Sequence, residues 1–275
     1  MTQQVNERLL TLVNIVISFL LLLALVSSGI FVDKESLKIN MGAKSMSPSI
    51  VHLFGTDWLG RDMLARTLKG LTLSFFIGIL TSFISVLLAL TFSIISSFNQ
   101  YLDRIITWLI DVFLSVPSIV LIILISFSFD GGLEGVVLGL AVTHWPTLTR
   151  VLRAEILQLK TADYVGISRS LGRSKLWIAS YHFLPHLLPQ VFIGFILLFP
   201  HAILHEATIT FLGLGLSSNQ ASIGIILSES MGYLSTGMWW LAFFPGLSLV
   251  FMVCLFDLLG KNLQKWMDPY NGSKG

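Results

Sequence analysis

Apolar residues gather into six long runs that short polar segments separate. A helix needs about 20 mostly apolar residues to cross the hydrocarbon core of a bilayer, and each run is close to that length. The runs cover residues 9–31, 71–97, 104–128, 133–150, 188–214 and 239–260. This pattern predicts an all-α integral membrane protein with six transmembrane helices.

The composition agrees with this fold class. Hydrophobic residues make up 54% of the 275 residues and charged residues 12%, and the mean hydropathy is +0.82. The single cysteine, Cys254, lies in the last apolar run, which excludes an intrachain disulfide and a thiolate metal site. Because little chain lies outside the runs, we expect one transmembrane domain over residues 1–275.

Basic residues in the loops predict the orientation of the helices. Residues 150–187 carry six Lys and Arg side chains, whereas residues 129–135 and 215–238 carry none. The excess of positive charge in cytoplasmic loops places 150–187 and both termini in the cytoplasm. Residues 32–70 are the exception, because an even number of crossings puts them outside although they hold six basic and four acidic residues.

The basic loop contains a second pattern, DYVGISRSLGRSKLWIASYHFLPHLLP, over residues 163–189. Its apolar spacing predicts a short cytoplasmic helix pair that runs to Phe183, where Pro185 and Pro189 stop it. Gly172 allows a close turn between the two helices. The exposed end of this pair would dock a partner; the alternative is a solvated basic loop.

This segment resembles the coupling loop of ABC importer permeases. The family pattern is Glu-Ala-Ala, three residues, Gly, and a Leu-Pro about twelve residues later. Gly172 and Leu184-Pro185 fit this pattern, whereas Gly166, Ile167 and Ser168 replace the Glu-Ala-Ala. The resemblance implies ATPase coupling by a set of seven residues: Asp163, Tyr164, Gly166, Arg169, Gly172, Leu184 and Pro185.

Three other stretches resemble the second permease subunit of the dipeptide, oligopeptide and nickel importers. They are FGTDWLGRDMLAR (54–66), FLGLGL (211–216) and the segment 239–269. The resemblance spans roughly residues 52–269 and implies a permease core at about 71–262. It also implies a homologous second permease subunit, two ABC ATPase subunits, an extracytoplasmic substrate-binding protein and a bacterial inner membrane.

The same resemblance predicts a transporter subunit and no enzyme. The sequence has no phosphate-binding Gly-Lys-Ser/Thr motif, so partner ATPases would use ATP and Mg²⁺ while this chain binds no cofactor and no nucleic acid.

The spacing in 58–71 predicts an amphipathic helix at the outer interface, with its charges in local caps and pairs. The glycines of 211–216 are expected to end the fifth span at the outer surface.

The segment HAILHE carries three polar groups inside an apolar run. Such groups are costly in a bilayer and mark candidate functional sites. His201 and His205 are one helical turn apart and can reach one ligand, whereas Glu206 lies about 100° from His205 and would point to a neighbouring span. His144, placed nearer the cytoplasmic side, completes the predicted substrate path.

The histidines favour a divalent metal as the substrate. Nickel permeases resemble this chain in having histidines at these positions, where peptide permeases usually have small apolar residues; Glu206 and Asp111 would then serve as scaffold. Imidazole is a good ligand for nickel, so we expect transient binding by His201 and His205 of a free or chelated ion. The alternatives are a dipeptide or oligopeptide permease with packing histidines and, remotely, an intramembrane metalloprotease, whose His-Glu-x-x-His motif is missing here.

Overall fold

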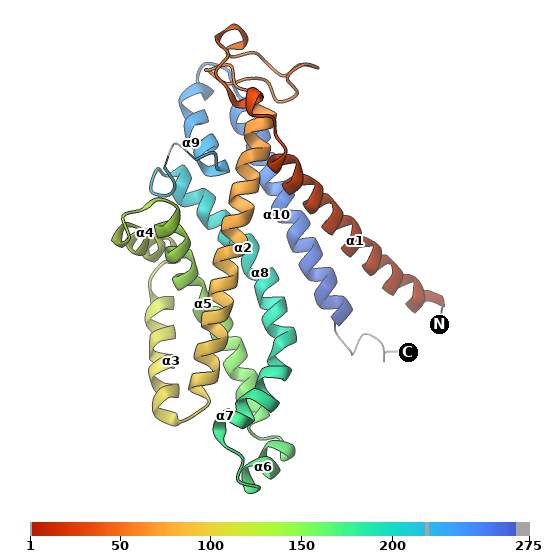
Figure 1. Cartoon of the computed structure of the whole chain (residues 1–275), viewed down its shortest axis with the longest axis vertical. Coiled ribbons are helices and arrows are strands. Elements are labelled where there is room, and N and C mark those ends of the chain that lie inside the picture. Colours follow the sequence, from red (N-terminus) through yellow and green to blue (C-terminus); the bar gives the residue numbers. More distant parts are fainter. Residues whose placement is uncertain (1, 218–219, 268–275) are drawn as a thin grey trace.

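The computed structural model describes residues 2–217 and 220–267 as an elongated helical bundle (Figure 1). The long helices are α1 (Thr2–Ile30), α2 (Met63–Ser96), α3 (Gln100–Ser115), α5 (Gly132–Leu159), α8 (Leu184–Phe211) and α10 (Trp240–Met267). Shorter helices are α4 (Ser118–Ser128), α6 (Asp163–Ser170), α7 (Lys175–Ile178) and α9 (Ile223–Leu234). The described residues form no β-strand, which confirms the all-α class.

Four of the described helical segments are long and apolar enough to cross a membrane. They are Arg8–Ile30, Met63–Ser96, Lys175–Phe211 and Trp240–Met267. The pair α3 and α4 makes a fifth span if it is counted as one bent unit. Helix α5 has 28 residues, but charged side chains lower its hydropathy, so the count of six stays a prediction.

The predicted span 104–128 is wrong as one continuous helix. Helices α3 and α4 meet at an angle of 101°, and Val116 between them has an extended backbone. The residue before a proline is disfavoured in the α region because the proline ring crowds its backbone. Pro117 therefore breaks the helix inside an apolar run that shows no change in hydropathy.

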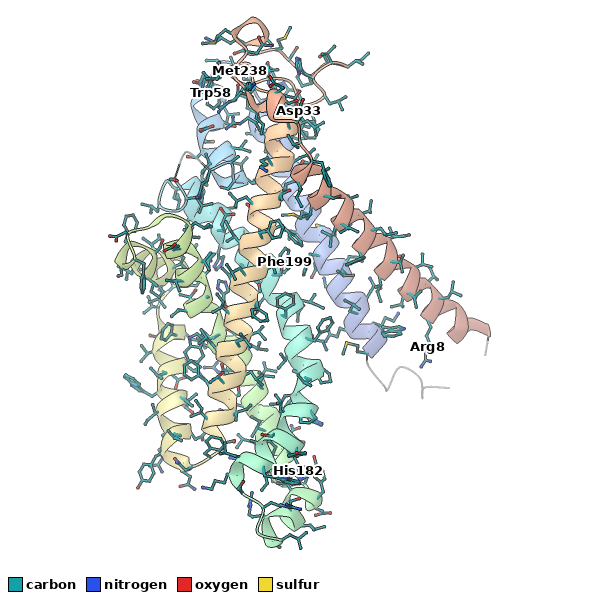
Figure 2. All side chains as sticks on the ribbon, viewed as in Figure 1. Arg8, Asp33, Trp58, His182, Phe199 and Met238 are labelled. Atoms are coloured by element: carbon teal, nitrogen blue, oxygen red, sulfur yellow. The ribbon has the colours of Figure 1, made fainter. Side chains whose placement is uncertain are left out.

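Helix α2 is the centre of the bundle and packs against α1, α5 and α8. Small and polar side chains of α2 allow α5 to approach it closely. Hydrogen bonds to backbone carbonyls then connect the two helices: Ser85 Oγ of α2 donates to Ala141 O of α5 over 3.0 Å. Phe199 fills the junction of α2, α8 and α10, with its ring centroid 5.2 Å from Phe75 and 3.7 Å from Phe256 (Figure 2).

Two non-membrane segments occupy opposite ends of the bundle (Figure 1). We call residues 31–62 the cap; they include the 3₁₀ turns η1 (Lys34–Leu37) and η2 (Met41–Ala43). We call residues 163–183 the tip; they include α6, α7 and the π-helical turn η3 (Ala179–Phe183). The bundle therefore separates two distinct surfaces by the length of its helices.

The predicted amphipathic helix in the cap is wrong. Residues 54–62 form an irregular turn with an isolated bridge between Thr56 and Asp62, and Gly60 has a φ of 74° that an L side chain rarely adopts. Asp62 caps α2 by accepting a hydrogen bond from Ala65 N over 2.9 Å. Residues from Met63 onward therefore belong to the second span itself.

Candidate functional site

The structure brings His144 and His205 together inside the bundle. Their ring centroids lie 5.1 Å apart, although the sequence placed His144 nearer the cytoplasmic side. Helices α5 and α8 are in contact, so two histidines 61 positions apart in the sequence meet; the depth of His144 in the membrane stays a prediction. His201 lies one turn before His205 on α8 and is exposed on the chain surface.

The hydrogen bonds of these histidines define their free nitrogens. His144 Nδ1 lies 2.6 Å from Leu140 O; since a carbonyl only accepts, Nδ1 carries the hydrogen and Nε2 is left as an acceptor. His205 Nδ1 is buried and has no hydrogen-bond partner among the described residues. The two rings thus offer unused nitrogen atoms within one small region.

The described residues contain no group of three or more His, Cys, Asp or Glu side chains placed to hold a metal ion. Protein zinc sites have at least three protein ligands, so the histidine cluster is not a complete resident site. Transient metal binding by His201 and His205 stays a prediction, because an ion in transit needs fewer and weaker contacts.

Glu206 points away from the histidines, toward α2, as its helical position predicts. Its exposed fraction is 0%. Its carboxylate accepts hydrogen bonds from Ser74 Oγ of α2 over 2.8 Å and from Thr210 Oγ1 over 3.1 Å. This burial favours a scaffold role between α2 and α8; a contact of Glu206 with the substrate path stays a prediction.

The tip contains the predicted helix pair. Helix α6 ends before Gly172, whose φ of 76° turns the chain, and α7 follows from Lys175. The two prolines do not stop the second helix as predicted: η3 leads into α8, which begins at Leu184 and passes through Pro189. Pro185 lies in the first turn of α8, where its missing N–H costs no hydrogen bond.

An aromatic cluster around His182 holds the tip together (Figure 2). His182 Nε2 lies 2.8 Å from Ser168 Oγ of α6, and its ring packs edge-on against Tyr164 and Trp177 at 5.2 and 5.3 Å. The sequence predicted no functional role for Ser168, Trp177 or His182. The available signal was that Trp177, Tyr181 and His182 stand at i, i+4 and i+5, on one face of a helix.

The tip exposes an apolar surface next to basic side chains. Tyr164, Ile167 and Leu171 project outward, and Leu171 is 75% exposed. A groove of about 700 Å³ runs beside them, lined by residues 160–163, 166, 167, 170 and 171. Contiguous exposed apolar surface of this kind is typical of a protein contact.

A network of ion pairs fastens the cap to α2 and α9. Asp57 is fully buried and accepts hydrogen bonds from Arg61 Nε over 2.6 Å and from Arg66 Nη1 over 2.8 Å. Arg66 also donates to Glu229 of α9 over 2.7 Å. Both guanidinium groups lie over the ring of Trp58, so the predicted local caps and pairs in this segment are confirmed.

The described residues thus form a bundle of apolar helices with histidines between α5 and α8 and an exposed apolar surface at the tip. The chain belongs to the family of binding-protein-dependent transport system inner membrane components, whose profile matches residues 83–270. It is a permease subunit of an ABC importer.

The named relatives are peptide permeases. The chain is 31% identical to a putative peptide transport system permease protein of Brucella suis biovar 1 (strain 1330), over 94% of this chain and 86% of the relative. It is 30% identical to the dipeptide transport system permease protein DppC of Bacillus subtilis (strain 168), over 92% of this chain and 79% of the relative. Nickel permeases are absent from these names, so the comparisons favour the peptide alternative over nickel.

The fold also matches a solved transporter. A chain of the inward-facing MetNI methionine ABC transporter superposes with a TM-score of 0.62 at 19% identity, covering 75% of this chain and 98% of the other. At this identity the likeness supports the fold alone. It agrees with the all-helical fold of the described residues.

Proposed function

We propose that this chain forms one half of the membrane path of an importer for dipeptides or oligopeptides. The identities of about 30% over nearly the whole chain to peptide permeases support this substrate class. Nickel stays the second candidate, because one observation favours it: the unused nitrogen atoms of His144 and His205 lie close together.

The proposed partners are a homologous permease subunit, two ABC ATPases and an extracytoplasmic binding protein. The ATPases use ATP and Mg²⁺, and this chain binds neither. In this arrangement the protein crosses the bacterial inner membrane with both termini and the tip in the cytoplasm. The basic residues of 150–187 support this orientation.

The proposed transport mechanism depends on the connection between the tip and the two helices that carry the histidines. The tip joins the end of α5 at Leu159 to the start of α8 at Leu184, and His144 and His205 lie on these two helices. Closure of the ATPases on the exposed face of α6 would therefore move both helices at once, which can switch the path between inward-open and outward-open states.

A substrate-stimulated ATPase assay on the assembled complex tests the proposed function. We expect peptide-loaded binding protein to stimulate ATP hydrolysis, and nickel-loaded protein to have no effect. The His201→Ala/His205→Ala variant should keep peptide stimulation, since Ala maintains the helix and the histidines then only pack. Stimulation by nickel alone, lost in this variant, would move the assignment to metal transport.

A further inference from the structure

Two apolar side chains of the cap have little contact with the rest of the chain. Ile50 is 98% exposed and Val51 is 82% exposed. On the exposed flank of α2, by comparison, Phe76 and Phe83 are 51% and 53% exposed, because neighbouring side chains of the bundle cover part of each ring. An apolar residue that projects this far from its own chain is suited to fill a pocket in another molecule.

A closed turn holds these two side chains in place. We call residues 46–56 the finger. Ser49 N donates to His52 O over 2.8 Å, and His52 N donates to Ser49 Oγ over 3.1 Å, so the two exposed residues lie between the ends of a hydrogen-bonded turn. Below it, Thr56 N donates to Met46 O over 2.9 Å, and Met46 N donates to Thr56 Oγ1 over 2.8 Å. The finger is therefore an ordered element of the cap.

The base of the finger is fixed to α10. Trp240 Nε1 donates to Thr56 O over 3.3 Å, and the ring of Phe54 stacks on Phe244 with the centroids 4.5 Å apart. Thr56 is fully buried. A partner that binds the exposed end therefore meets a preformed shape, and little conformational freedom is lost on binding.

The finger joins the bundle outside the hydrocarbon core. Met63 N, at the start of α2, donates to Gly55 O over 3.0 Å. The apolar run of this helix begins only at Leu71, eight residues or about 12 Å later at 1.5 Å per residue, and the charged residues Arg66 and Lys69 lie between. One headgroup layer is roughly 5–8 Å thick. The base of the finger thus lies where its neighbours are water and other proteins.

The two ends of the bundle present the same kind of feature. Leu171 of the tip is 75% exposed and belongs to the surface proposed above to meet the ATPases. The cap lies at the opposite end (Figure 1), which a soluble partner reaches from outside the cell membrane. A second permease subunit would instead pack along the flanks of the helices. The family description names the soluble partner of this kind, a binding protein.

We propose that the finger docks the extracytoplasmic binding protein of the importer, with Ile50 and Val51 filling an apolar depression on its surface. This inference rests on the proposed function, because it assigns a contact surface to one of the proposed partners. A contact made by so few side chains is small, and small interfaces are typical of transient encounters. Such a contact suits a partner that has to leave after each delivery of substrate.

Replacing both side chains tests the proposal. The probe is the peptide-loaded binding protein of the same importer, and its Kd for the complete complex in nanodiscs is measured by biolayer interferometry. Ile50→Ser/Val51→Ser should raise this Kd at least tenfold, because it removes two aliphatic side chains from the contact, while ATP hydrolysis at saturating binding protein stays unchanged. The matched control is Glu35→Ser, which changes another exposed side chain of the cap and should leave the Kd unchanged.

Cross-linking identifies the molecule that the finger contacts. The Val51→Cys variant in a Cys254→Ser background has a single cysteine, which a benzophenone maleimide can label in the purified complex. We expect a cross-link to the binding protein. An unchanged Kd in the double serine variant, or a cross-link only to the second permease or to lipid, would overturn the inference and leave the proposed function intact. If peptide-loaded binding protein fails to stimulate ATP hydrolysis by the wild-type complex, the proposed function itself is wrong.

Discussion

Replacing Asp57 with Ala should release the cap from the bundle. The Asp57 carboxylate accepts four hydrogen bonds, two from the backbone N–H groups of Leu59 and Arg61 and two from guanidinium groups. Hydrogen bonds to charged groups contribute about 1.5–3 kcal/mol each. Glu229 remains as a partner for Arg66, which offsets part of the loss.

The expected loss of stability is about 3–5 kcal/mol, the range typical of removing one member of a buried ion pair. At about 2–4 °C per kcal/mol for a chain of this size, the melting temperature should fall on the order of 10 °C. Asp57→Asn keeps an acceptor oxygen but removes the charge, so its melting temperature should lie between those of the wild type and Asp57→Ala.

Thermal unfolding of the purified complex, followed by the loss of its size-exclusion peak, measures this effect. The control is Glu35→Ala, which breaks an exposed pair with Lys38 in the same cap and should cost about 0–1 kcal/mol. Equal melting temperatures for Asp57→Ala and Glu35→Ala would refute the reasoning, since the buried network would then contribute no more than a surface pair.

Substitutions at three further positions test the tip and the scaffold. Gly172→Val forces a β-branched residue to a φ of 76°, so the ATPases should no longer co-purify with the inserted permease; undiminished recovery would contradict this. His182→Ala removes the contact with Ser168 and should lower ATP-driven uptake severalfold, with partial rescue by His182→Gln. Ser74→Ala leaves Glu206 without its α2 partner and should reduce stability by about 1–3 kcal/mol, measured by the same unfolding assay.

The sequence predicts four of the spans, those near 9–31, 71–97, 188–214 and 239–260, because hydrophobic length depends on composition alone. The prediction fails where a single residue matters more than the mean hydropathy of a run. Pro117 breaks the helix within an apolar run, although the Val116-Pro117 pair was itself a visible signal of a helix break. The prediction fails again in the cap, where the apolar spacing of 58–71 is that of a helix although residues 58–62 form a turn and the helix begins only at Met63. The turn there depends on Asp57 contacting Arg66 and on Glu229 from α9, contacts that local periodicity cannot reveal.

The candidate site was only partly predictable for a related reason. Polar residues in apolar runs can be found by inspection, so His144 and His205 were visible. Their proximity was not, because it depends on how α5 packs against α8. The substrate was harder still: histidines at these positions indicated nickel, whereas the overall identity to peptide permeases favours peptides. A few ligand-type side chains carry less information about substrate than similarity along the whole chain.

The polar groups inside the apolar runs fall into two sets according to where they point. Glu206 is satisfied by the side chains of Ser74 on α2 and Thr210 on α8, so it fixes helix positions and has little capacity left for a ligand. His201 is exposed in the single chain, within an apolar run where lipid is a poor environment for a polar group. His201 and His205 lie on α8 and His144 lies on α5, and these are the two helices that the tip connects. Under the proposed function, a displacement of the tip would therefore rearrange the histidines while the buried Glu206 contacts hold α2 and α8 together, which is the behaviour that an ATP-driven path for a polar substrate requires.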